Sequence, residues 1–254
     1  MAGLAADLAA ALDAVQLARQ VGLEPDAWQA QVLRSRSLRL LLNCCRQSGK
    51  STITAVLAMH TALYQAPALV LLLSPSLRQS VELFRKVLDA YEALGRPLPA
   101  DAESVLRLEL PNGSRLVALP GKEATIRGFS GVRLLIIDEA SRVDDALYQA
   151  CRPMLSVSGG RLVALSTPFG KRGFFFHEWT EGAAWERVQI TAEHCPRIPP
   201  EFLAEERRAL PDAWYAQEYL CEFRETTDQV FAYEHVQAAL SPDVAPLFPL
   251  GGEP

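Results

Sequence analysis

The stretch Leu38–Val56, LRLLLNCCRQSGKSTITAV, decides the fold because it joins a short apolar run to a polar loop and then to a helical stretch. The apolar run Leu38–Leu42 predicts a buried strand, and Ser51–Tyr64 has helical periodicity. Between them, Gly49–Ser51 (GKS) matches the end of the phosphate-binding loop G-x-x-x-x-G-K-[ST]. A helix N-terminus after such a loop offers free backbone N–H groups and the positive dipole end to phosphates. The stretch therefore predicts a nucleotide site, although Cys44 stands where the loop motif opens with glycine.

The residues of this loop have separate expected roles. Lys50 would reach the β- and γ-phosphates of a nucleotide, and the Ser51 hydroxyl would bind Mg²⁺. Gln29 lies on a short helix expected from Pro25 to Leu33, where its amide would donate to and accept from the adenine edge of ATP. Its spacing fits a helix residue facing solvent equally well. The expected nucleotide-binding residues are Gln29, Arg46, Gln47, Ser48, Gly49, Lys50, Ser51 and Thr52.

Composition narrows the class of protein. The chain has 254 residues, of which 49% are hydrophobic, so it can bury the core of one large domain with at most a small appendage. Its net charge of −5 disfavours nucleic-acid binding over the whole surface but leaves room for a local basic patch. Five cysteines without a C-x-x-C pair favour a reducing cytoplasm. No apolar run reaches the ~18 residues of a membrane span, and the N-terminus, expected to be one amphipathic helix over Leu4–Val21, lacks the basic segment of a signal peptide.

Apolar runs alternate with helical stretches along most of the chain. Ala68–Ser74, Leu134–Ile137 and Arg161–Ser166 predict buried strands, whereas Leu77–Leu94 predicts a helix and Pro111–Gly113 marks a hairpin turn. Nearly continuous apolar strands separated by helices predict an α/β fold with a parallel sheet covered on both faces. After about residue 185 the pattern becomes mainly helical, and the chain ends in a Pro- and Gly-rich tail.

Two acidic residues follow the apolar run Leu134–Ile137 directly. An aspartate at the carboxyl end of a buried strand can hold Mg²⁺, and the next acid can activate an attacking water. An Asp-Glu pair downstream of a phosphate loop favours ATP hydrolysis over nucleotide storage. We therefore expect Ser51 and Asp138 to form the metal site and Glu139 to be the catalytic base.

Three segments in order resemble the ATPase domain of the large terminase, the viral DNA-packaging motor of tailed bacteriophages. They are Cys44–Thr52 (CCRQSGKST), Ile126–Ser141 (IRGFSGVRLLIIDEAS) and Ala164–Phe176 (ALSTPFGKRGFFF). Tyr215–Phe223 (YAQEYLCEF) is similar to the end of that domain, at its lid subdomain. The phosphate loops of this family often lack the first glycine and carry Arg-Gln before the final Gly-Lys. The loop that opens with Cys44 therefore suits this family, and the resemblance covers about residues 26–223.

The resemblance implies a fold and a division of the chain. The expected fold is α/β, a RecA-like P-loop NTPase of the additional-strand, catalytic-glutamate type, with a mainly parallel sheet flanked by helices and a small helical lid. Residues 1–182 would form the ATPase core with an N-terminal helical extension, residues 183–226 the lid, and residues 227–254 a linker-like tail. The full-length enzyme of this family carries a C-terminal nuclease. The acids after Glu225 are too scattered for such a site, so we expect a Mg²⁺-dependent ATPase without nuclease activity.

The resemblance also implies further site residues. Arg127 matches the arginine that the family is thought to insert into a neighbouring subunit's site, where it would stabilise charge on the γ-phosphoryl group. Arg46, beside the phosphates in the same chain, is the competing candidate, and a turn-stabilising role for Arg127 stays open. Ser166 and Thr167 match the coupling motif, which would sense the γ-phosphate and relay its loss to the parts that grip DNA.

Partners follow from the same resemblance. They are double-stranded DNA, a portal protein, a small terminase subunit and further copies of the chain in a ring on the procapsid, in the host cytoplasm and away from membranes. Sequence-independent contacts to DNA phosphates would come from basic side chains, although a solvated helix face explains each of them as well. These candidates are Arg78, Arg85, Lys86, Lys171 and Arg172.

Two other functions fit part of the pattern. A superfamily 2 helicase or translocase shares the phosphate loop, the Asp-Glu pair and a Ser-Thr element, but the residues after Gly173 are too few for its second RecA-like domain. A prophage-derived scaffold that binds ATP without hydrolysing it is the other candidate. Intact Lys50, Ser51, Asp138 and Glu139 weigh against the scaffold.

Overall fold

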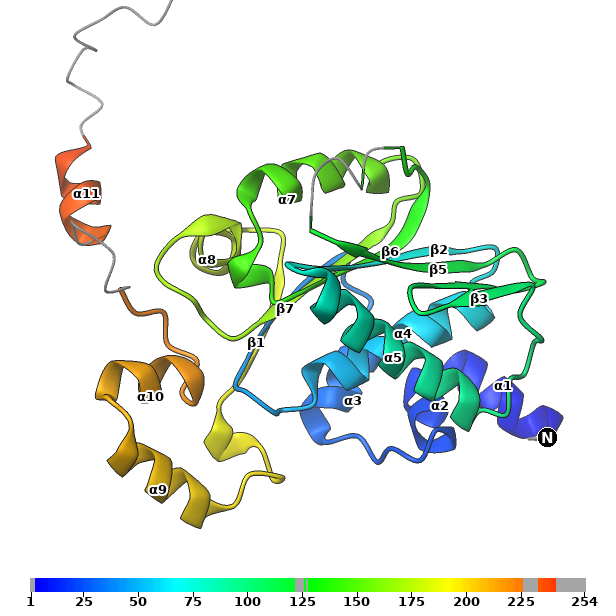
Figure 1. Ribbon diagram of the computed structural model, residues 1–254, viewed down its shortest axis with the longest axis horizontal. Coiled ribbons are helices and arrows are strands. Elements are labelled where there is room, and N and C mark those ends of the chain that lie inside the picture. The colour runs from blue at the N-terminus through cyan, green and yellow to red at the C-terminus, as the bar shows by residue number, and fades with distance from the viewer. Residues whose placement is uncertain (1–2, 122–125, 127, 226–232, 241–254) are drawn as a thin grey trace, which may run out of the picture.

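The computed structural model describes residues 3–121, 126, 128–225 and 233–240. Its centre is an eight-stranded sheet with the order β3-β4-β5-β2-β6-β7-β1-β8 (Figure 1). The strands are β1 (Arg39–Cys44), β2 (Leu69–Ser74), β3 (Ala102–Ser104), β4 (Arg107–Glu109), β5 (Arg115–Pro120), β6 (Val132–Asp138), β7 (Arg161–Ser166) and β8 (Glu186–Ile190). The pairs from β5 to β8 in this order are parallel, and β3, β4 and β5 pair antiparallel at one edge.

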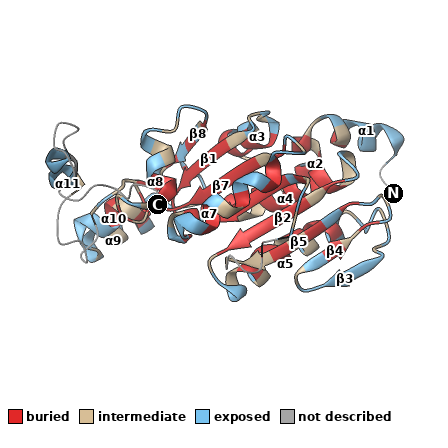
Figure 2. Cartoon of the chain, turned by 90° about the horizontal axis from the view of Figure 1, so that it is seen from above, coloured by how far each residue is buried: buried red, intermediate tan, exposed pale blue. Residues whose placement is uncertain are grey.

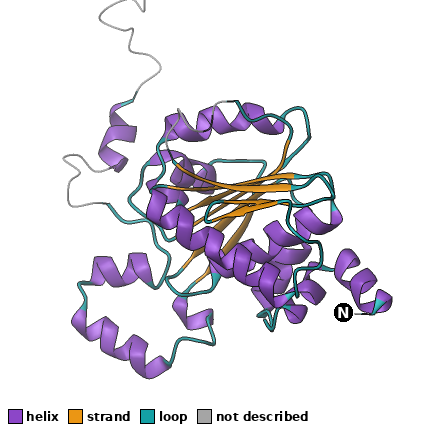
Figure 3. Cartoon of the chain, turned by 45° about the vertical axis from the view of Figure 1, so that its right-hand side comes forward, coloured by secondary structure: helices purple, strands orange, loops and turns teal. Residues whose placement is uncertain are grey.

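Helices cover both faces of this sheet, and Figure 3 shows the strands as one layer between them. The helices are α1 (Leu4–Leu12), α2 (Ala14–Gln20), α3 (Ala27–Arg34), α4 (Lys50–Tyr64), α5 (Leu77–Ala93), α7 (Asp145–Cys151), α8 (Gly173–Thr180), α9 (Pro200–Ala209), α10 (Asp212–Glu218) and α11 (Tyr233–Ala239). Short 3₁₀ turns are η1 (Ala140–Arg142), η2 (Arg152–Leu155) and η3 (Ala192–His194). None of the helices in these ranges combines the length and apolar character needed to span a bilayer.

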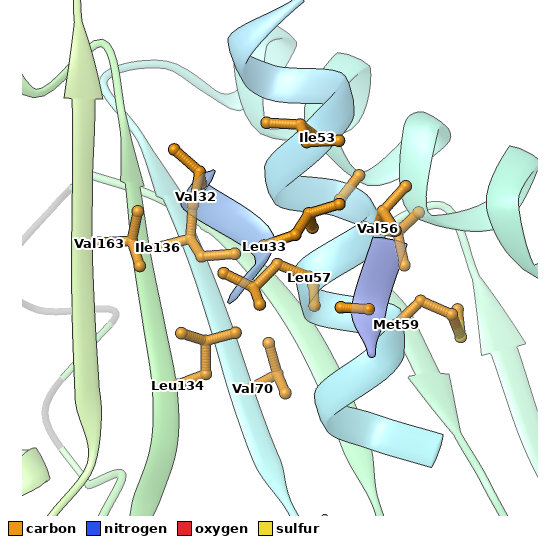
Figure 4. Packing of buried hydrophobic residues seen from close by; sticks show 14 of the residues in the cluster. Val32, Leu33, Ile53, Val56, Leu57, Met59, Val70, Leu134, Ile136 and Val163 are labelled. Atoms are coloured by element: carbon orange, nitrogen blue, oxygen red, sulfur yellow. The ribbon is translucent and has the colours of Figure 1, made fainter. Parts of the chain in front are cut away.

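The core has two layers because successive strand residues point to opposite faces. In β1, Leu40 and Leu42 join the layer under helices α1 to α5, whereas Leu41 joins the layer under α7 and α8. Figure 4 shows the first layer, with Ile53 and Leu57 of α4 packed over the strands. Figure 2 shows the central strands as the buried part and β3 as an exposed edge. Each fully buried leucine contributes about 1.5–3 kcal/mol, so the sheet is the rigid platform for its loops.

The strand order confirms the predicted fold class. β7 lies between β1, which carries the phosphate loop, and β6, which ends in Asp138. This inserted strand is the additional strand of the expected class. The hairpin predicted around Pro111–Gly113 is also present, since Glu109 pairs with Arg115 across β4 and β5.

Three local predictions are wrong. The helix predicted over Leu4–Val21 is broken at Asp13, whose side chain caps α2 by accepting a hydrogen bond from Val15 N at 3.1 Å. Glu186–Ile190, predicted to belong to a mainly helical lid, is strand β8 and pairs with β1. The tail predicted to be linker-like contains α11 within its described part, 233–240. A core boundary after residue 190, in place of 182, agrees with the sheet, and the division into core and lid stays a proposal.

Candidate nucleotide-binding site

The residues predicted to bind phosphate and metal meet at the carboxyl ends of β1, β6 and β7. Ser51 Oγ, at the start of α4, donates to Asp138 Oδ2 at 3.0 Å. Lys50 Nζ lies 3.7 Å from Glu139 Oε1 and 3.4 Å from Thr167 Oγ1. Parallel strands end at one edge of a sheet, so segments far apart in sequence deliver these groups to one place. The predicted cluster is therefore present, with a cation, a hydroxyl and two carboxylates in contact.

Backbone conformation explains why the phosphate loop needs Gly49 and tolerates Cys44. Gly49 has φ +87°, in the left-handed region, and a Cβ there would lie 2.9 Å from Gln29 Nε2. Cys44 ends β1 and is fully buried in the core below the loop. Burial raises the pKa of its thiol to about 12, so it stays protonated and apolar. The first position of this loop is thus a core position, where a side chain is an advantage.

Glu139 also has a left-handed backbone, with φ +49° and ψ +43°, which is unusual for a residue with a side chain. Asp138 Oδ1 accepts a hydrogen bond from Glu139 N at 3.0 Å, and Arg142 N donates to Glu139 O at 2.9 Å. Such conformations cost about 1–3 kcal/mol and cluster at functional sites. Burial raises the pKa of Asp138, and the neighbouring charge of Glu139 raises it further. The turn η1 follows directly after Glu139.

A cavity of about 350 Å³ opens beside this cluster, on the side of Lys50 and Glu139. Its size suits the polyphosphate part of a nucleotide. Its lining contains Lys50, Glu139 and Thr167, which were predicted as site residues. It also contains Arg142, which was not. The full lining is Arg46, Gln47, Lys50, Gln79, Glu139, Arg142, Thr167 and Glu218. Gln47, Gly49 and Thr52 line a second hollow with Gln29 on the other side of the loop.

The two residues of the predicted coupling motif lie at the end of β7 and are tied to the turn after Glu139. Ser141 Oγ lies 2.7 Å from Ser166 Oγ and donates to the carbonyl oxygen of Thr167 at 2.8 Å. Thr167 reaches Lys50 through its hydroxyl. Lys50 therefore has a hydrogen-bonded route to the end of β7, while the coupling role itself stays a prediction.

Gln29 has a structural role that the sequence prediction did not include: its side chain caps α3 and contacts the phosphate loop. Its Oε1 accepts from Asp26 N at 3.0 Å in a capping box at the start of α3, and its Nε2 donates to Ser48 O at 3.4 Å. The signal was present in the sequence, because an Asp followed three residues later by Gln is a capping-box pattern. Reading of adenine by Gln29 stays a proposal, since the amide retains one further hydrogen and one lone pair.

Two residues of the C-terminal segment hold the phosphate loop and were missed. The carboxylate of Glu218, at the end of α10, is buried and lies 2.5 Å from Arg46 Nε, although Arg46 itself is 63% exposed. Arg197 donates to Ser48 O and forms an ion pair with Asp26 at 2.7 Å. No local pattern marks these two residues, because their partners lie 149 and 172 residues away.

The other predicted positions divide into three groups. Arg127 lies outside the described residues, so its contact with a neighbouring subunit stays a prediction. Among the DNA candidates, Arg85 is paired with Glu82 at 2.8 Å, and Lys171 is paired with Glu234. The other candidates form no ion pair among the described residues, so their charges are available to contact DNA phosphates. These are Arg78 and Arg172, together with the half-buried Lys86.

The sequence and the fold resemble large terminases. The family model "Terminase large subunit, T4likevirus-type, N-terminal" matches residues 41–238. The terminase large subunit of Thermus virus P23-45 is 26% identical over 248 residues, which cover 84% of this chain and 51% of that protein. This chain thus spans about half the length of the curated relatives it matches.

Solved structures show the same fold. The large terminase ATPase domain of Thermus phage P74-26 matches with a TM-score of 0.73 at 22% identity, over 82% of this chain and 97% of that one. The large terminase of a thermophilic bacteriophage, solved in complex with ADP, matches with a TM-score of 0.62 at 12% identity, over 78% of this chain and 54% of that one. Because the family model matches residues 41–238 of the 254, this chain belongs to the terminase large-subunit family and corresponds to the N-terminal part described by that model.

Proposed function

We propose that the chain hydrolyses ATP with Mg²⁺ and that hydrolysis drives double-stranded viral DNA into a procapsid. One observation carries the proposal: Lys50, Ser51, Asp138 and Glu139 meet at a single sheet edge, where Lys50 and Glu139 line a cavity of about 350 Å³. Membership of the terminase large-subunit family supports DNA packaging as the purpose of hydrolysis. A related large terminase has been solved with ADP and with ATP-γ-S, which supports an adenine nucleotide as the ligand.

The proposed metal site fits the ion in its chemistry. The Ser51 hydroxyl and the Asp138 carboxylate are hard oxygen ligands 3.0 Å apart, and Mg²⁺ prefers one or two such groups together with phosphate oxygens and waters. When bound there, Mg²⁺ would neutralise charge that develops on the β- and γ-phosphate oxygens.

The protein groups then have separate tasks in hydrolysis. The left-handed turn holds the Glu139 carboxylate over the cavity, where it would accept a proton from a water as that water attacks the γ-phosphorus. Lys50 would balance the charge that develops on the oxygen bridging the β- and γ-phosphorus atoms as the bond from this oxygen to the γ-phosphorus breaks and ADP leaves. Lys50 lies against Glu139 and Thr167, which supports a place for its cation beside the terminal phosphates.

Translocation requires that loss of the terminal phosphate changes the parts of the protein that contact DNA. We propose that Ser166 and Thr167 relay loss of the terminal phosphate through Ser141, and that basic residues on α5 and before α8 contact DNA. The chain would act as a ring of identical copies with a portal protein and a small terminase subunit. Arg127 would complete a neighbour's site, and Arg46 is the alternative from the same chain.

The test is steady-state ATPase activity of the purified chain across a wide range of protein concentrations, with Glu139→Gln and Arg127→Ala alongside. A specific rate that rises with concentration and is abolished by both substitutions supports hydrolysis in an assembly. A rate independent of concentration with a harmless Arg127→Ala supports a monomeric translocase in which Arg46 stabilises charge. ATP binding without turnover, unchanged by Glu139→Gln, contradicts the proposal and supports a scaffold.

A further inference from the structure

Arg142 is a cation of the nucleotide cavity to which no role has yet been assigned. It ends η1, three residues after Glu139, and it lines the same cavity as Lys50 and Thr167. The left-handed turn at Glu139 explains this position. The turn reverses the chain and is closed by the hydrogen bond from Arg142 N to Glu139 O at 2.9 Å. One strained residue thus delivers both a carboxylate and a guanidinium to one end of the cavity.

The other two cations of the cavity already face carboxylates. Arg46 lies 2.5 Å from Glu218, and Lys50 lies 3.7 Å from Glu139. Arg142 has no ion pair among the described residues. A bound triphosphate carries more negative charge than Lys50 alone balances, and an arginine stays protonated at every relevant pH. Arg142 is therefore the cavity cation available to an incoming anion without breaking an existing ion pair.

An aromatic ring fixes the direction of this guanidinium. The Cζ atom of Arg142 lies 3.9 Å from the centre of the Phe169 ring, within the range of a cation–π contact. Phe169 follows Thr167 by two residues, so the ring belongs to the segment that leaves the end of β7. A guanidinium held over a ring by its central carbon can still donate hydrogen bonds from the N–H groups at its edge. This arrangement suits bidentate recognition of a phosphate.

The position of Arg142 selects one end of the nucleotide. Gly49, the residue before α4, and Thr52, in the first turn of α4, line the second hollow, where the inner phosphates would be cradled. Glu139, Thr167 and Arg142 lie on the side of β6 and β7, where the proposed attacking water and the terminal phosphate meet. We propose that Arg142 binds the γ-phosphate of ATP within its own chain and distinguishes ATP from ADP. This inference rests on the proposed nucleotide function.

The experiment measures the dissociation constants of ATP-γ-S and ADP by calorimetry in Mg²⁺ buffer, using the whole chain. Arg142→Ala should weaken ATP-γ-S binding by roughly tenfold to a hundredfold, the range for a lost hydrogen bond to a charged group, and leave ADP binding within about twofold. Arg142→Lys should fall between, since it keeps the charge but loses the planar fork. Arg152→Ala is the matched control, because Arg152 is likewise exposed and stacked on a ring, that of Tyr148, but does not line the cavity.

The outcomes distinguish failure of this inference from failure of the proposed nucleotide function. If the wild-type chain binds neither nucleotide, or Lys50→Ala binds as the wild type does, the proposed function itself fails. If the wild type binds both but Arg142→Ala changes neither constant, or changes both equally, Arg142 is not a γ-phosphate ligand. Thermal melting without nucleotide shows whether Arg142→Ala is folded. If it is not folded, the ratio of the ATP-γ-S and ADP dissociation constants of Arg142→Lys, compared with that of the wild type, tests the inference.

Discussion

Gly49→Ala tests the account of the phosphate loop most directly, because the structure separates two costs of adding one methyl group. The first is the backbone: φ is +87°, and a left-handed backbone costs an alanine about 1–2 kcal/mol. The lower freedom of alanine in the unfolded chain offsets about 0.4–1 kcal/mol of this. The second cost is contact, since the new Cβ would lie 2.9 Å from Gln29 Nε2 and 3.4 Å from Arg197 Nη2.

Gly22→Ala is the control for the first cost alone. Gly22 has φ +81°, and a Cβ there would meet nothing within 4 Å. We expect Gly22→Ala to lower the free energy of unfolding by about 1 kcal/mol. Gly49→Ala should lower it by about 1 kcal/mol more, because displacing the Gln29 amide disrupts the capping box of α3.

Urea denaturation of the two variants and the wild type measures the difference. Gln29→Ala combined with Gly49→Ala should cost less than the sum of the two single changes, because the contact is then counted once. If Gly49→Ala is no more destabilising than Gly22→Ala, the close approach between the phosphate loop and α3 does not exist as described. The explanation of Gly49 would then reduce to its backbone angle.

Three further predictions use other parts of the chain. Glu218→Gln should tighten ATP-γ-S binding up to about fivefold in calorimetry by releasing Arg46, because the guanidinium is 63% exposed and such pairs contribute at most about 1 kcal/mol; weaker binding would contradict this. Burial lowers the pKa of His60 below its ordinary value of 6.5, so the unfolded chain binds the proton first as the pH falls. Stability should therefore decrease below about pH 6.5 by at most about 1.4 kcal/mol per pH unit, and His60→Gln should remove that part in urea titrations at pH 7.5 and 5.5. Ser141→Ala removes two hydrogen bonds to the end of β7 and should lower the free energy of unfolding by about 1–3 kcal/mol, whereas an unchanged urea midpoint would show that those bonds are not formed.

Local patterns predicted the parts of the site that local sequence determines. The phosphate loop before Lys50 and the Asp138-Glu139 pair each combine an apolar strand with polar residues at its end, and both appear where they were expected. Strand β8, Glu186–Ile190, escaped because it lies at the sheet edge and alternates polar with apolar residues, so it has no continuous apolar run. The four residues from Arg187 to Ile190 alternate, which is a strand signal of its own, but the helical periodicity of the following residues obscured it.

Contacts between distant segments account for the rest. Arg142 follows Glu139 by three residues, yet its position in the cavity depends on a left-handed turn and on Phe169, neither of which a periodicity can indicate. Arg197 and Glu218 depend on the path of the chain after β8. Sequence patterns therefore located the groups that we propose to react, while the residues that hold and direct them required the fold.

Those holding residues give the C-terminal segment a role in the nucleotide site. Arg197 precedes α9 and binds the Ser48 carbonyl, whereas Glu218 ends α10 and binds the side chain of Arg46. The backbone is joined as well, since Arg46 N donates to Glu218 O at 3.3 Å. Both ends of the α9–α10 segment thus contact the phosphate loop directly. Arg46 and Glu218 both line the cavity, so phosphates bound there would compete with Glu218 for the same guanidinium. The helices beyond β8 are therefore joined to the phosphate loop, and Glu218 of α10 itself lines the cavity.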